Sequence, residues 1–195
     1  MSPSGEPGPH PLRLFFALWP TGAHRRALAV ATGPVVAQVE GQPVPAANLH
    51  VTLAFLGSVP GRTFDQLVEV GRQGGYPAIE LDFDRLEYWP KPRVLVAMPS
   101  RVPPAGAAMV ERLWQRIEPL GFARETRPWR PHLTLARKIR RPPPEGLALE
   151  PGPLPPAGDA ARWGLALVES VTHAHGARYR PLAEWPLGSK GVASL

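Results

Sequence analysis

The feature that most constrains this chain is a four-residue pattern, His-x-Thr-Leu, that occurs once in each half of the sequence. One copy spans positions 50–53 and the other spans positions 132–135. Each copy lies in a short apolar run bounded by turn residues, which is typical of a β-strand. Because side chains alternate across a strand, the His and the Thr of each copy share one face. The opposite face, which we expect to pack on the core, carries Val51, Leu53, Leu133 and Leu135.

Each copy therefore presents an imidazole and a hydroxyl together on a polar strand face. If the two polar faces meet across a groove, they form a two-histidine acid–base site with two hydroxyls available to hold an anion. A single His on a strand is more often a structural residue than a catalyst, but two copies in matching contexts favour catalysis. The candidate site residues are His50, Thr52, His132 and Thr134.

The match between the two halves extends beyond this motif. In the first half, the sequence predicts a buried strand over 12–18, a helix over 22–39 with Thr21 as its N-cap, and a loop over 41–47. In the second half it predicts a strand over 93–98, an amphipathic helix over 104–120 and a loop over 121–131. A motif strand follows each loop. The shared order indicates a duplication in which each half supplies one motif to a common cleft.

The remaining segments predict an α+β fold. A helix is expected over 63–72, and the alternating apolar and polar residues of 79–86 predict a half-exposed strand. Strands over 163–171 and 178–185 are expected to form a hairpin that turns near Gly176. Short turns between strands favour antiparallel pairing over a purely parallel sheet.

Length and composition bound the domain organisation. A chain of 195 residues with 44% hydrophobic residues is long enough for one globular domain, or for two small lobes that share a core. Many of the 27 Pro lie near the N-terminus and between 142 and 156. We therefore expect a disordered Pro-rich tail over 1–11, a single two-lobed domain over 12–188 with a Pro-rich surface loop over 142–156, and a C-terminal tail over 189–195.

The charge balance favours a polyanionic partner. The formal net charge is +6 at pH 7, and the sequence pI is about 10.5. A basic stretch over 124–141 surrounds the second motif, and it is either a solvated face or a phosphate-binding surface. Arg carries nearly all the positive charge, and its planar guanidinium suits phosphate, although a biased genome leaves the same signature.

Several classes of site are excluded or disfavoured. The chain has no Cys, which excludes disulfides, thiolate catalysis and Cys-ligated zinc. The pair His173 and His175 suits a hairpin tip better than a metal site, so we expect no bound metal. The apolar run at 14–19 is too short to span a membrane and no signal peptide is evident, which predicts a cytoplasmic protein.

The residues of the two motifs resemble those of the 2H phosphoesterases, whose signature is a pair of His-x-Thr motifs. More specifically, the chain is similar to the bacterial and archaeal RNA 2′,3′-cyclic phosphodiesterases, historically called 2′–5′ RNA ligases. The resemblance covers most of the chain: an opening strand at 13–18, the first motif with its trailing Phe-Leu-Gly at 49–57, the second motif at 130–137, and hairpin residues at 169–170 and 176–179. The Pro-rich tail and the 142–156 loop depart from the family pattern.

The resemblance implies a pseudo-symmetric two-lobed α+β fold, with antiparallel sheets flanked by helices around a central cleft. It implies metal-independent hydrolysis of RNA 2′,3′-cyclic phosphate ends to 2′-phosphomonoesters without a cofactor, with His50 as general acid and His132 as general base. Thr52 and Thr134 would bind phosphate oxygens. Reversible 2′–5′ RNA ligation, for which the two histidine roles exchange, stays open.

The family also has the residue five positions after each His near the substrate base, which here is Phe55 and Arg137. Strand alternation predicts instead that an offset of five points to the core, unless the strands bulge or end at Ala54 and Ala136. Both residues are kept as candidate nucleotide-binding residues, together with Arg130 in the basic stretch.

Two other functions stay open. A 2H phosphodiesterase that acts on a small cyclic nucleotide would carry the same motifs, and a non-catalytic RNA-binding module would use the basic 124–141 surface. The intact His50 and His132 argue against the binding module. The expected partner is an RNA with a 2′,3′-cyclic phosphate end, tRNA fragments among the candidates, and the protein is expected to be a monomer without membrane contact.

Overall fold

The computed structural model describes residues 11–148, 163–173 and 176–188, which form two sheets and three α-helices. The strands are β1 (Leu12–Pro20), β2 (Gln42–Pro43), β3 (Val51–Val59), β4 (Arg85–Trp89), β5 (Val94–Met98), β6 (Leu133–Arg137), β7 (Trp163–His173) and β8 (Gly176–Pro186). The helices are α1 (Gly22–Val36), α2 (Phe64–Arg72) and α3 (Pro104–Ile117), with short 3-10 turns at Ala46–Asn48, Gly61–Thr63 and Glu118–Leu120.

Both sheets are four-stranded, and all their strand pairs are antiparallel. The first sheet has the strand order β3-β1-β7-β8, and the second has the order β2-β6-β5-β4. The first motif strand, β3, is an edge of its sheet, whereas the second, β6, lies between β2 and β5. The prediction of a two-lobed α+β fold built on antiparallel sheets is confirmed.

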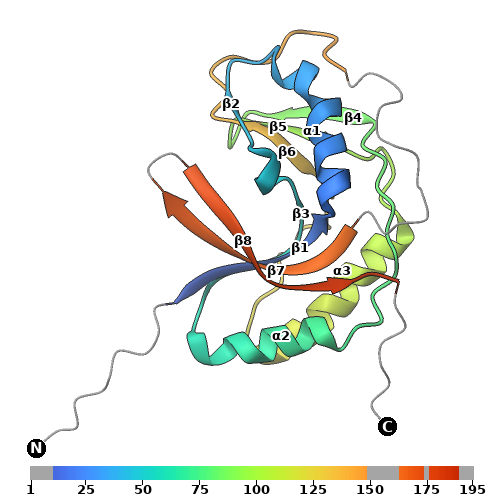
Figure 1. Ribbon diagram of the computed structural model, residues 1–195, viewed down its shortest axis with the longest axis vertical. Coiled ribbons are helices and arrows are strands. Elements are labelled where there is room, and N and C mark those ends of the chain that lie inside the picture. Colours follow the sequence, from blue (N-terminus) through green and yellow to red (C-terminus); the bar gives the residue numbers. More distant parts are fainter. Residues whose placement is uncertain (1–10, 149–162, 174–175, 189–195) are drawn as a thin grey trace, which may run out of the picture.

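The two halves of the chain interlock, so neither lobe is built from one half of the chain alone. The short strand β2 comes from the first half but pairs with β6 in the second sheet. Strand β7 follows the second motif but pairs with β1 in the first sheet. Helix α1 contacts β6 as well as β1, and α3 contacts β3. In Figure 1, α1 accordingly lies beside the second sheet, and α2 and α3 lie against the first.

Local sequence explains where the helices begin and end. The hydroxyl of Thr21 accepts a hydrogen bond from the backbone N–H of His24 at 3.4 Å, so Thr21 is the predicted N-cap of α1. Helix α1 ends at Val36 and not at the predicted residue 39. The backbone N–H groups of Gln38 and Val39 each bond three residues back, which tightens the chain into turns.

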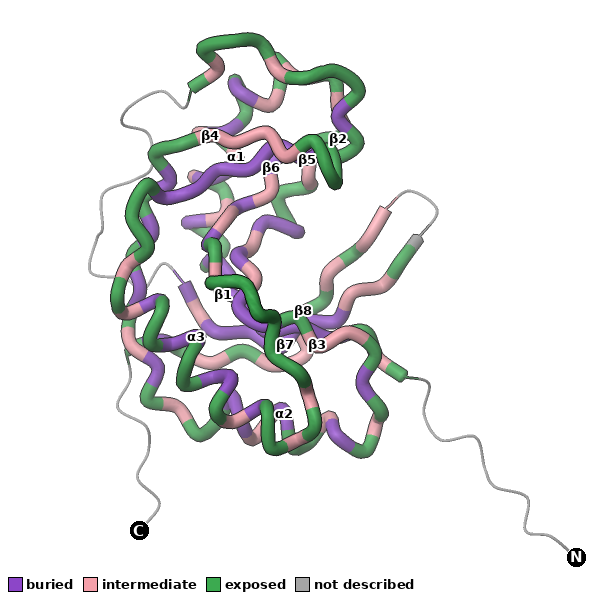
Figure 2. Tube along the Cα trace, turned by 180° about the vertical axis from the view of Figure 1, so that it is seen from behind, coloured by how far each residue is buried: buried purple, intermediate pink, exposed green. Residues whose placement is uncertain are grey.

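One continuous core joins the two sheets. It contains buried residues from both motif strands, from the neighbouring strands and from all three helices, and buried residues are purple in Figure 2. Fully buried members include Phe16, Leu28, Leu67, Leu95, Leu113, Leu133 and Leu165. The core-facing prediction for Val51, Leu53, Leu133 and Leu135 is also confirmed, because all four are at most 4% exposed.

The predicted strand over 79–86 is wrong for most of its length. Ile79, Leu81 and Phe83 are buried and the residues between them are exposed, so the alternation itself is correct. The segment nevertheless has no strand partner before Arg85, where pairing of β4 with β5 begins. Alternation encodes which side chains are buried, and a strand also needs a neighbour with free backbone groups.

The described residues leave some predictions untested. The predicted tails, much of the 142–156 loop and the side chains of His173 and His175 lie outside the described part, so the limits 12–188 of the domain stay a prediction. Among the described helices, none combines the length and the hydropathy that a membrane crossing requires.

Candidate active site

Both motif strands carry the same β-bulge. In β3, Thr52 lies opposite Ala17 of β1 and Ala54 lies opposite Phe16, which leaves Leu53 as an extra residue. In β6, Thr134 lies opposite Val96 of β5 and Ala136 lies opposite Leu95, so Leu135 is an extra residue in the same way. An extra residue on one strand reverses the alternation of the side chains that follow it.

The bulges turn the residue five positions after each motif His onto the polar face of its strand. Leu53 and Ala54 are both buried, and the next residue, Phe55, is 40% exposed. The second motif repeats this pattern, with buried Leu135 and Ala136 followed by exposed Arg137. The expectation from strict alternation, that Phe55 and Arg137 point to the core, is therefore wrong. The bulges lie at Leu53 and Leu135, one residue before Ala54 and Ala136.

A cleft of about 430 Å³ brings the two motifs together. It receives both histidines and both threonines, together with the two residues that the bulges redirect. Its lining residues are Arg13, Phe15, His50, Thr52, Phe55, Trp89, Lys91, Pro92, Val94, Arg127, His132, Thr134, Arg137, Ser170 and Tyr179. The predicted meeting of the two His-x-Thr faces across one cleft is therefore present in the fold.

Both imidazoles are anchored in the same way. Nδ1 of His50 lies 2.6 Å from the carbonyl oxygen of Asn48, and Nδ1 of His132 lies 2.8 Å from the carbonyl oxygen of Arg130. A carbonyl oxygen can only accept, so each Nδ1 carries the proton and donates. This arrangement fixes the tautomer of each ring and leaves Nε2 as the nitrogen available for proton transfer.

Aromatic rings surround both histidines. The ring of His50 contacts Phe15 and Tyr179 at centroid distances of 5.0 and 4.9 Å, and Trp19 stacks on it at 6.0 Å. The ring of His132 contacts Trp89 at 4.7 Å. These contacts orient the imidazoles and remove water from them, which disfavours the charged form.

The pKa values of both histidines are lowered in the cleft. Burial is the main cause for His50, whose pKa is lowered to about 4, with smaller contributions from the positive charge of Arg137 and from His132. Burial also lowers the pKa of His132, assisted by the charges of Arg137 and Arg130. The hydrogen bonds to the backbone carbonyls oppose these shifts in both cases. At neutral pH, His50 of the free protein is therefore neutral.

The cleft is strongly cationic. Arg13, Lys91, Arg127 and Arg137 line it, and no Asp or Glu is present among the described lining residues. The guanidinium of Arg13 lies 4.7 Å from the centroid of the Phe55 ring, which combines a positive charge with an aromatic surface. A cleft of this kind attracts and holds a phosphate next to a flat apolar group.

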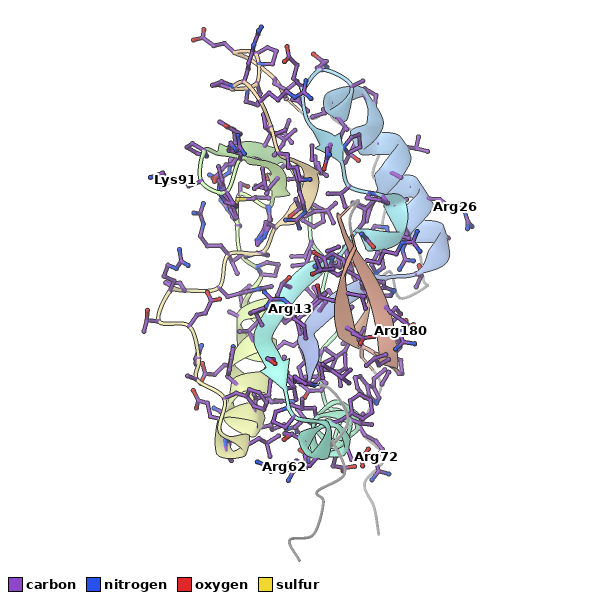
Figure 3. All side chains as sticks on the ribbon, turned by 90° about the vertical axis from the view of Figure 1, so that its left-hand side faces the viewer. Arg13, Arg26, Arg62, Arg72, Lys91 and Arg180 are labelled. Atoms are coloured by element: carbon purple, nitrogen blue, oxygen red, sulfur yellow. The ribbon has the colours of Figure 1, made fainter. Side chains whose placement is uncertain are left out.

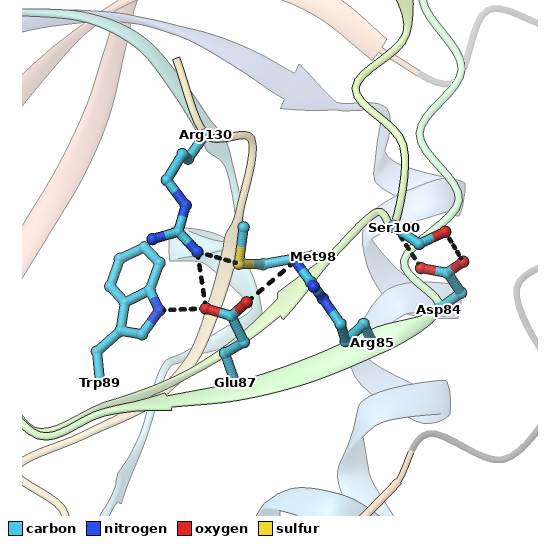
Figure 4. Close-up of polar contacts among 7 residues, drawn as sticks. All are labelled: Asp84, Arg85, Glu87, Trp89, Met98, Ser100 and Arg130. Carbon is cyan, nitrogen blue, oxygen red and sulfur yellow. Dashed lines mark hydrogen bonds and ion pairs between the residues drawn. The ribbon is translucent and has the colours of Figure 1, made fainter. Parts of the chain in front are cut away.

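Arg130 differs from the other predicted residues in its position. Its guanidinium donates to Glu87 at 2.9 Å and lies over the ring of Trp89, and the same Glu87 accepts from Trp89 Nε1 at 2.8 Å and pairs with Arg85 (Figure 4). The side chain of Arg130 does not line the cleft that contains both histidines but borders a neighbouring cavity. Its carbonyl group, which no sequence pattern singled out, anchors His132.

Two positioning residues were not found by sequence reasoning. Buried Asn48 donates from Nδ2 to the carbonyl of Ala177 at 2.8 Å and accepts from the N–H of Tyr179 at 3.3 Å, which ties the His50 loop to the β7–β8 hairpin. Trp129 donates from Nε1 to the carbonyl of Thr52 at 2.9 Å. The available signal was position, because Asn48 lies two residues before the first motif His and Trp129 lies three before the second.

A metal centre has no support in the described residues. No group of three or more His, Asp or Glu side chains within them is arranged to hold a metal ion. The chemistry that the cleft offers is that of two imidazoles, several hydroxyls, including those of Thr52 and Thr134, and several cations.

Comparisons with known proteins agree with this site. Residues 18–157 match the family model of the 2′-5′ RNA ligase superfamily. The chain is 31% identical over 183 residues to the RNA 2′,3′-cyclic phosphodiesterase of Escherichia coli strain K12. The aligned region covers 91% of this chain and 97% of the relative.

Solved structures extend the similarity to the fold. Escherichia coli LigT complexed with 3′-AMP is 28% identical, with a TM-score of 0.71 over 92% of this chain and 99% of LigT. TT0787 of Thermus thermophilus is 27% identical, with a TM-score of 0.66 over 92% of this chain and all of TT0787. With two anchored histidines in one cationic cleft and this agreement along most of its length, the chain belongs to the 2′-5′ RNA ligase superfamily.

Proposed function

We propose that this protein hydrolyses 2′,3′-cyclic phosphate ends of RNA to 2′-phosphomonoesters without a metal or cofactor. The observation that carries the proposal is the pair of histidines, each with Nδ1 donating to a carbonyl, in a cleft lined by four cations. The similarity to an enzyme named RNA 2′,3′-cyclic phosphodiesterase supports the same reaction.

The reaction needs a base, an acid and a stabilised phosphorane. His132 Nε2 takes a proton from water, the water oxygen bonds to phosphorus, and the bond from phosphorus to O3′ breaks. His50 then gives its proton to O3′, and the phosphate remains on O2′. Thr52 and Thr134 donate hydrogen bonds to the non-bridging oxygens, and the nearby cations stabilise the negative charge that develops on them.

The acid role of His50 requires that the substrate change its protonation. With its pKa lowered to about 4, the His50 imidazole of the free protein is mostly neutral at pH 7 and has no proton on Nε2 to give. A bound cyclic phosphate brings a negative charge beside the ring, which favours the imidazolium and raises its pKa. We therefore propose that His50 acquires its proton as substrate binds.

Ligation is the same displacement at phosphorus with a different nucleophile, and it uses the same groups. A 5′-hydroxyl of a second RNA end would replace water and attack the cyclic phosphate, the bond from phosphorus to O3′ would again break, and the product would carry a 2′–5′ bond. The name of the superfamily supports ligation as a second candidate activity.

The test is product analysis. An oligoribonucleotide that ends in a 2′,3′-cyclic phosphate should yield a 2′-phosphate, unchanged in rate by EDTA. His50→Ala and His132→Ala variants, checked for folding by circular dichroism, serve as controls. A 3′-phosphate product, or activity that EDTA abolishes and added zinc or manganese restores, would reject the proposal.

The proposal also covers the RNA substrates, the cellular location and the oligomeric state. We propose that the protein works in the cytoplasm as a monomer and that tRNA fragments are among its substrates. Equal activity on small cyclic nucleotides and on RNA ends would favour the small-molecule alternative. Sedimentation equilibrium tests the monomer, and cell fractionation tests the location.

A further inference from the structure

A second cavity adjoins the catalytic cleft. It has a volume of about 470 Å³, and its lining residues include Phe55 and His132, which also line the cleft. Its other walls come from α3 and from the loop before the second motif, and they include Trp114, Arg124 and Trp129. We call this space the tryptophan cavity, because Trp114 and Trp129 line it together with Trp89.

The lining of the tryptophan cavity combines aromatic rings with cations. Trp114 is buried at 4% exposure, so the accessible flat apolar surface comes from Trp89, Trp129 and Phe55, none of which is fully buried. The cations are Lys91, Arg124, Arg127 and Arg130. Single-stranded nucleic acids are bound by this combination, in which bases stack on aromatic rings and basic side chains follow the phosphates.

The chemistry of the substrate requires such a space. A 2′,3′-cyclic phosphate sits on the terminal ribose, and the rest of the strand leaves from the 5′ oxygen of the same ribose. When the cyclic phosphate lies between the two histidines, the preceding nucleotide must therefore occupy a space continuous with the cleft. The tryptophan cavity adjoins the cleft, because Phe55 and His132 line both spaces.

We propose that the tryptophan cavity binds the nucleotide on the 5′ side of the terminal one, and so makes the protein prefer an RNA strand over a mononucleoside cyclic phosphate. This inference rests on the proposed function and deepens it. One base stacks on the tryptophans, and the phosphate that joins it to the terminal ribose lies near Arg124 and Arg127.

Arg124 is a cation that reports on the tryptophan cavity and not on the catalytic cleft. It lines the tryptophan cavity and not the catalytic cleft, and Glu111 of α3 holds it in an ion pair at 2.5 Å. Its side chain stays 40% exposed, which leaves it accessible to a phosphate. Glu125 lines the same cavity and carries the opposite charge, so its removal should have the opposite effect.

The experiment compares adenosine 2′,3′-cyclic phosphate with a triadenylate that ends in the same cyclic phosphate. We expect the wild-type kcat/KM to be about tenfold higher for the triadenylate, because one stacked base contributes that much. Arg124→Gln should lower kcat/KM about threefold for the triadenylate and leave the mononucleotide unchanged. It should also reduce the salt dependence of log kcat/KM for the triadenylate by about 0.7, the value for one lost phosphate contact.

Two further variants sharpen the test. Glu125→Gln should raise kcat/KM for the triadenylate about twofold, which keeps the test decisive if Arg124→Gln folds poorly. Arg72→Gln is the matched control, because Arg72 also forms an ion pair, with Glu69 at 2.6 Å, but lies on α2 away from Lys91 (Figure 3). It should change neither substrate.

The outcomes separate this inference from the proposed function. Equal wild-type kcat/KM for the two substrates, or an Arg124→Gln variant that affects both or neither, would overturn the tryptophan cavity as a binding site while leaving hydrolysis intact. If neither substrate is hydrolysed by the wild-type protein, the proposed function itself fails.

Discussion

At the scale of single residues, the acid–base chemistry depends on which ring nitrogen of each histidine is not already hydrogen-bonded. Because the Nδ1 atoms of His50 and His132 donate to carbonyls, only Nε2 of each ring can exchange protons with substrate or water. In the proposed mechanism the two threonines have a lesser task, since their hydroxyls would share the phosphate with several cations. This difference in role sets the expected order of the mutational effects.

We expect His50→Ala and His132→Ala each to lower kcat by about 10²–10⁴-fold on a cyclic-phosphate RNA, because each removes an acid–base group. Thr52→Ala and Thr134→Ala should lower kcat by about 10²-fold or less, because other donors and the cations remain. Steady-state kinetics on folded variants provide the measurement. A His variant with near wild-type kcat would identify that histidine as structural.

The charge of Arg137 should set the position of the pH–rate profile. Two catalytic imidazoles predict a bell-shaped dependence of kcat/KM on pH, and Arg137 lowers the pKa of both in the free protein. Arg137→Gln removes this cation, so both pKa values rise and both limbs of the bell move to higher pH. Arg130→Gln is the contrast, because the charge of Arg130 lowers the pKa of His132. A bell that keeps its position in Arg137→Gln would contradict the electrostatic coupling.

Folding stability should depend on pH through His50. Its folded-state pKa of about 4 lies below the ordinary value of 6.5, so between these values the unfolded chain binds a proton that the folded protein does not. The free energy of unfolding should therefore decrease as pH is lowered from about 6.5 to about 4. Urea titrations across this range should show a smaller decrease for His50→Gln, and an identical decrease would exclude this origin.

At the scale of elements, the sequence predicted most of the fold, and its failures have identifiable causes. Apolar spacing located the helices and all the long strands, since burial of one face is a local property of the sequence. The bulges at Leu53 and Leu135 depend on how β3 and β6 pair with β1 and β5, and an ordinary Leu carries no sign of them. Resemblance alone indicated Phe55 and Arg137, and the bulges explain how both reach the cleft.

The contact between α3 and the first motif strand should matter for catalysis. Trp129 packs closely on Gly106 of α3, where an added Cβ would lie 2.8 Å from the ring, and the same indole donates to the carbonyl of Thr52. Gly106→Ala should displace the ring, lower stability by about 1–2 kcal/mol and reduce kcat several-fold, because overpacking exceeds the helix-propensity gain of at most about 1 kcal/mol.

Gly71→Ala is the matched control for Gly106→Ala. A Cβ at Gly71 of α2 would overlap the ring of Trp185, which does not line the cleft. This variant should lower the melting temperature while kcat of the folded protein stays unchanged. If the two variants reduce kcat equally, Trp129 does not position Thr52, and its hydrogen bond is only structural.

At the scale of the whole molecule, the two motifs cannot be separated from the strands that follow them. The match to the superfamily covers residues 18–157, which contain both motifs but neither β7 nor β8. Strand β7 lies between β1 and β8 in the first sheet, and its Leu165 and Leu167 are fully buried. Without β7, β1 would pair on one side only and would expose apolar surface that the rest of the chain cannot cover.

A pair of truncations should therefore separate the folding unit from the motif-bearing segment. The last described residues are integrated into the fold, because Leu187 is 7% exposed and the N–H of Gly188 donates to the carbonyl of Tyr76 at 3.0 Å. At the other end, Leu12 already pairs with Val59. A chain of residues 11–188 should match the full protein in melting temperature and kcat, whereas 11–157 should not fold and should not hydrolyse a cyclic phosphate. Calorimetry and the product assay test both, and a stable, active 11–157 fragment would show that the motif halves fold without the closing hairpin.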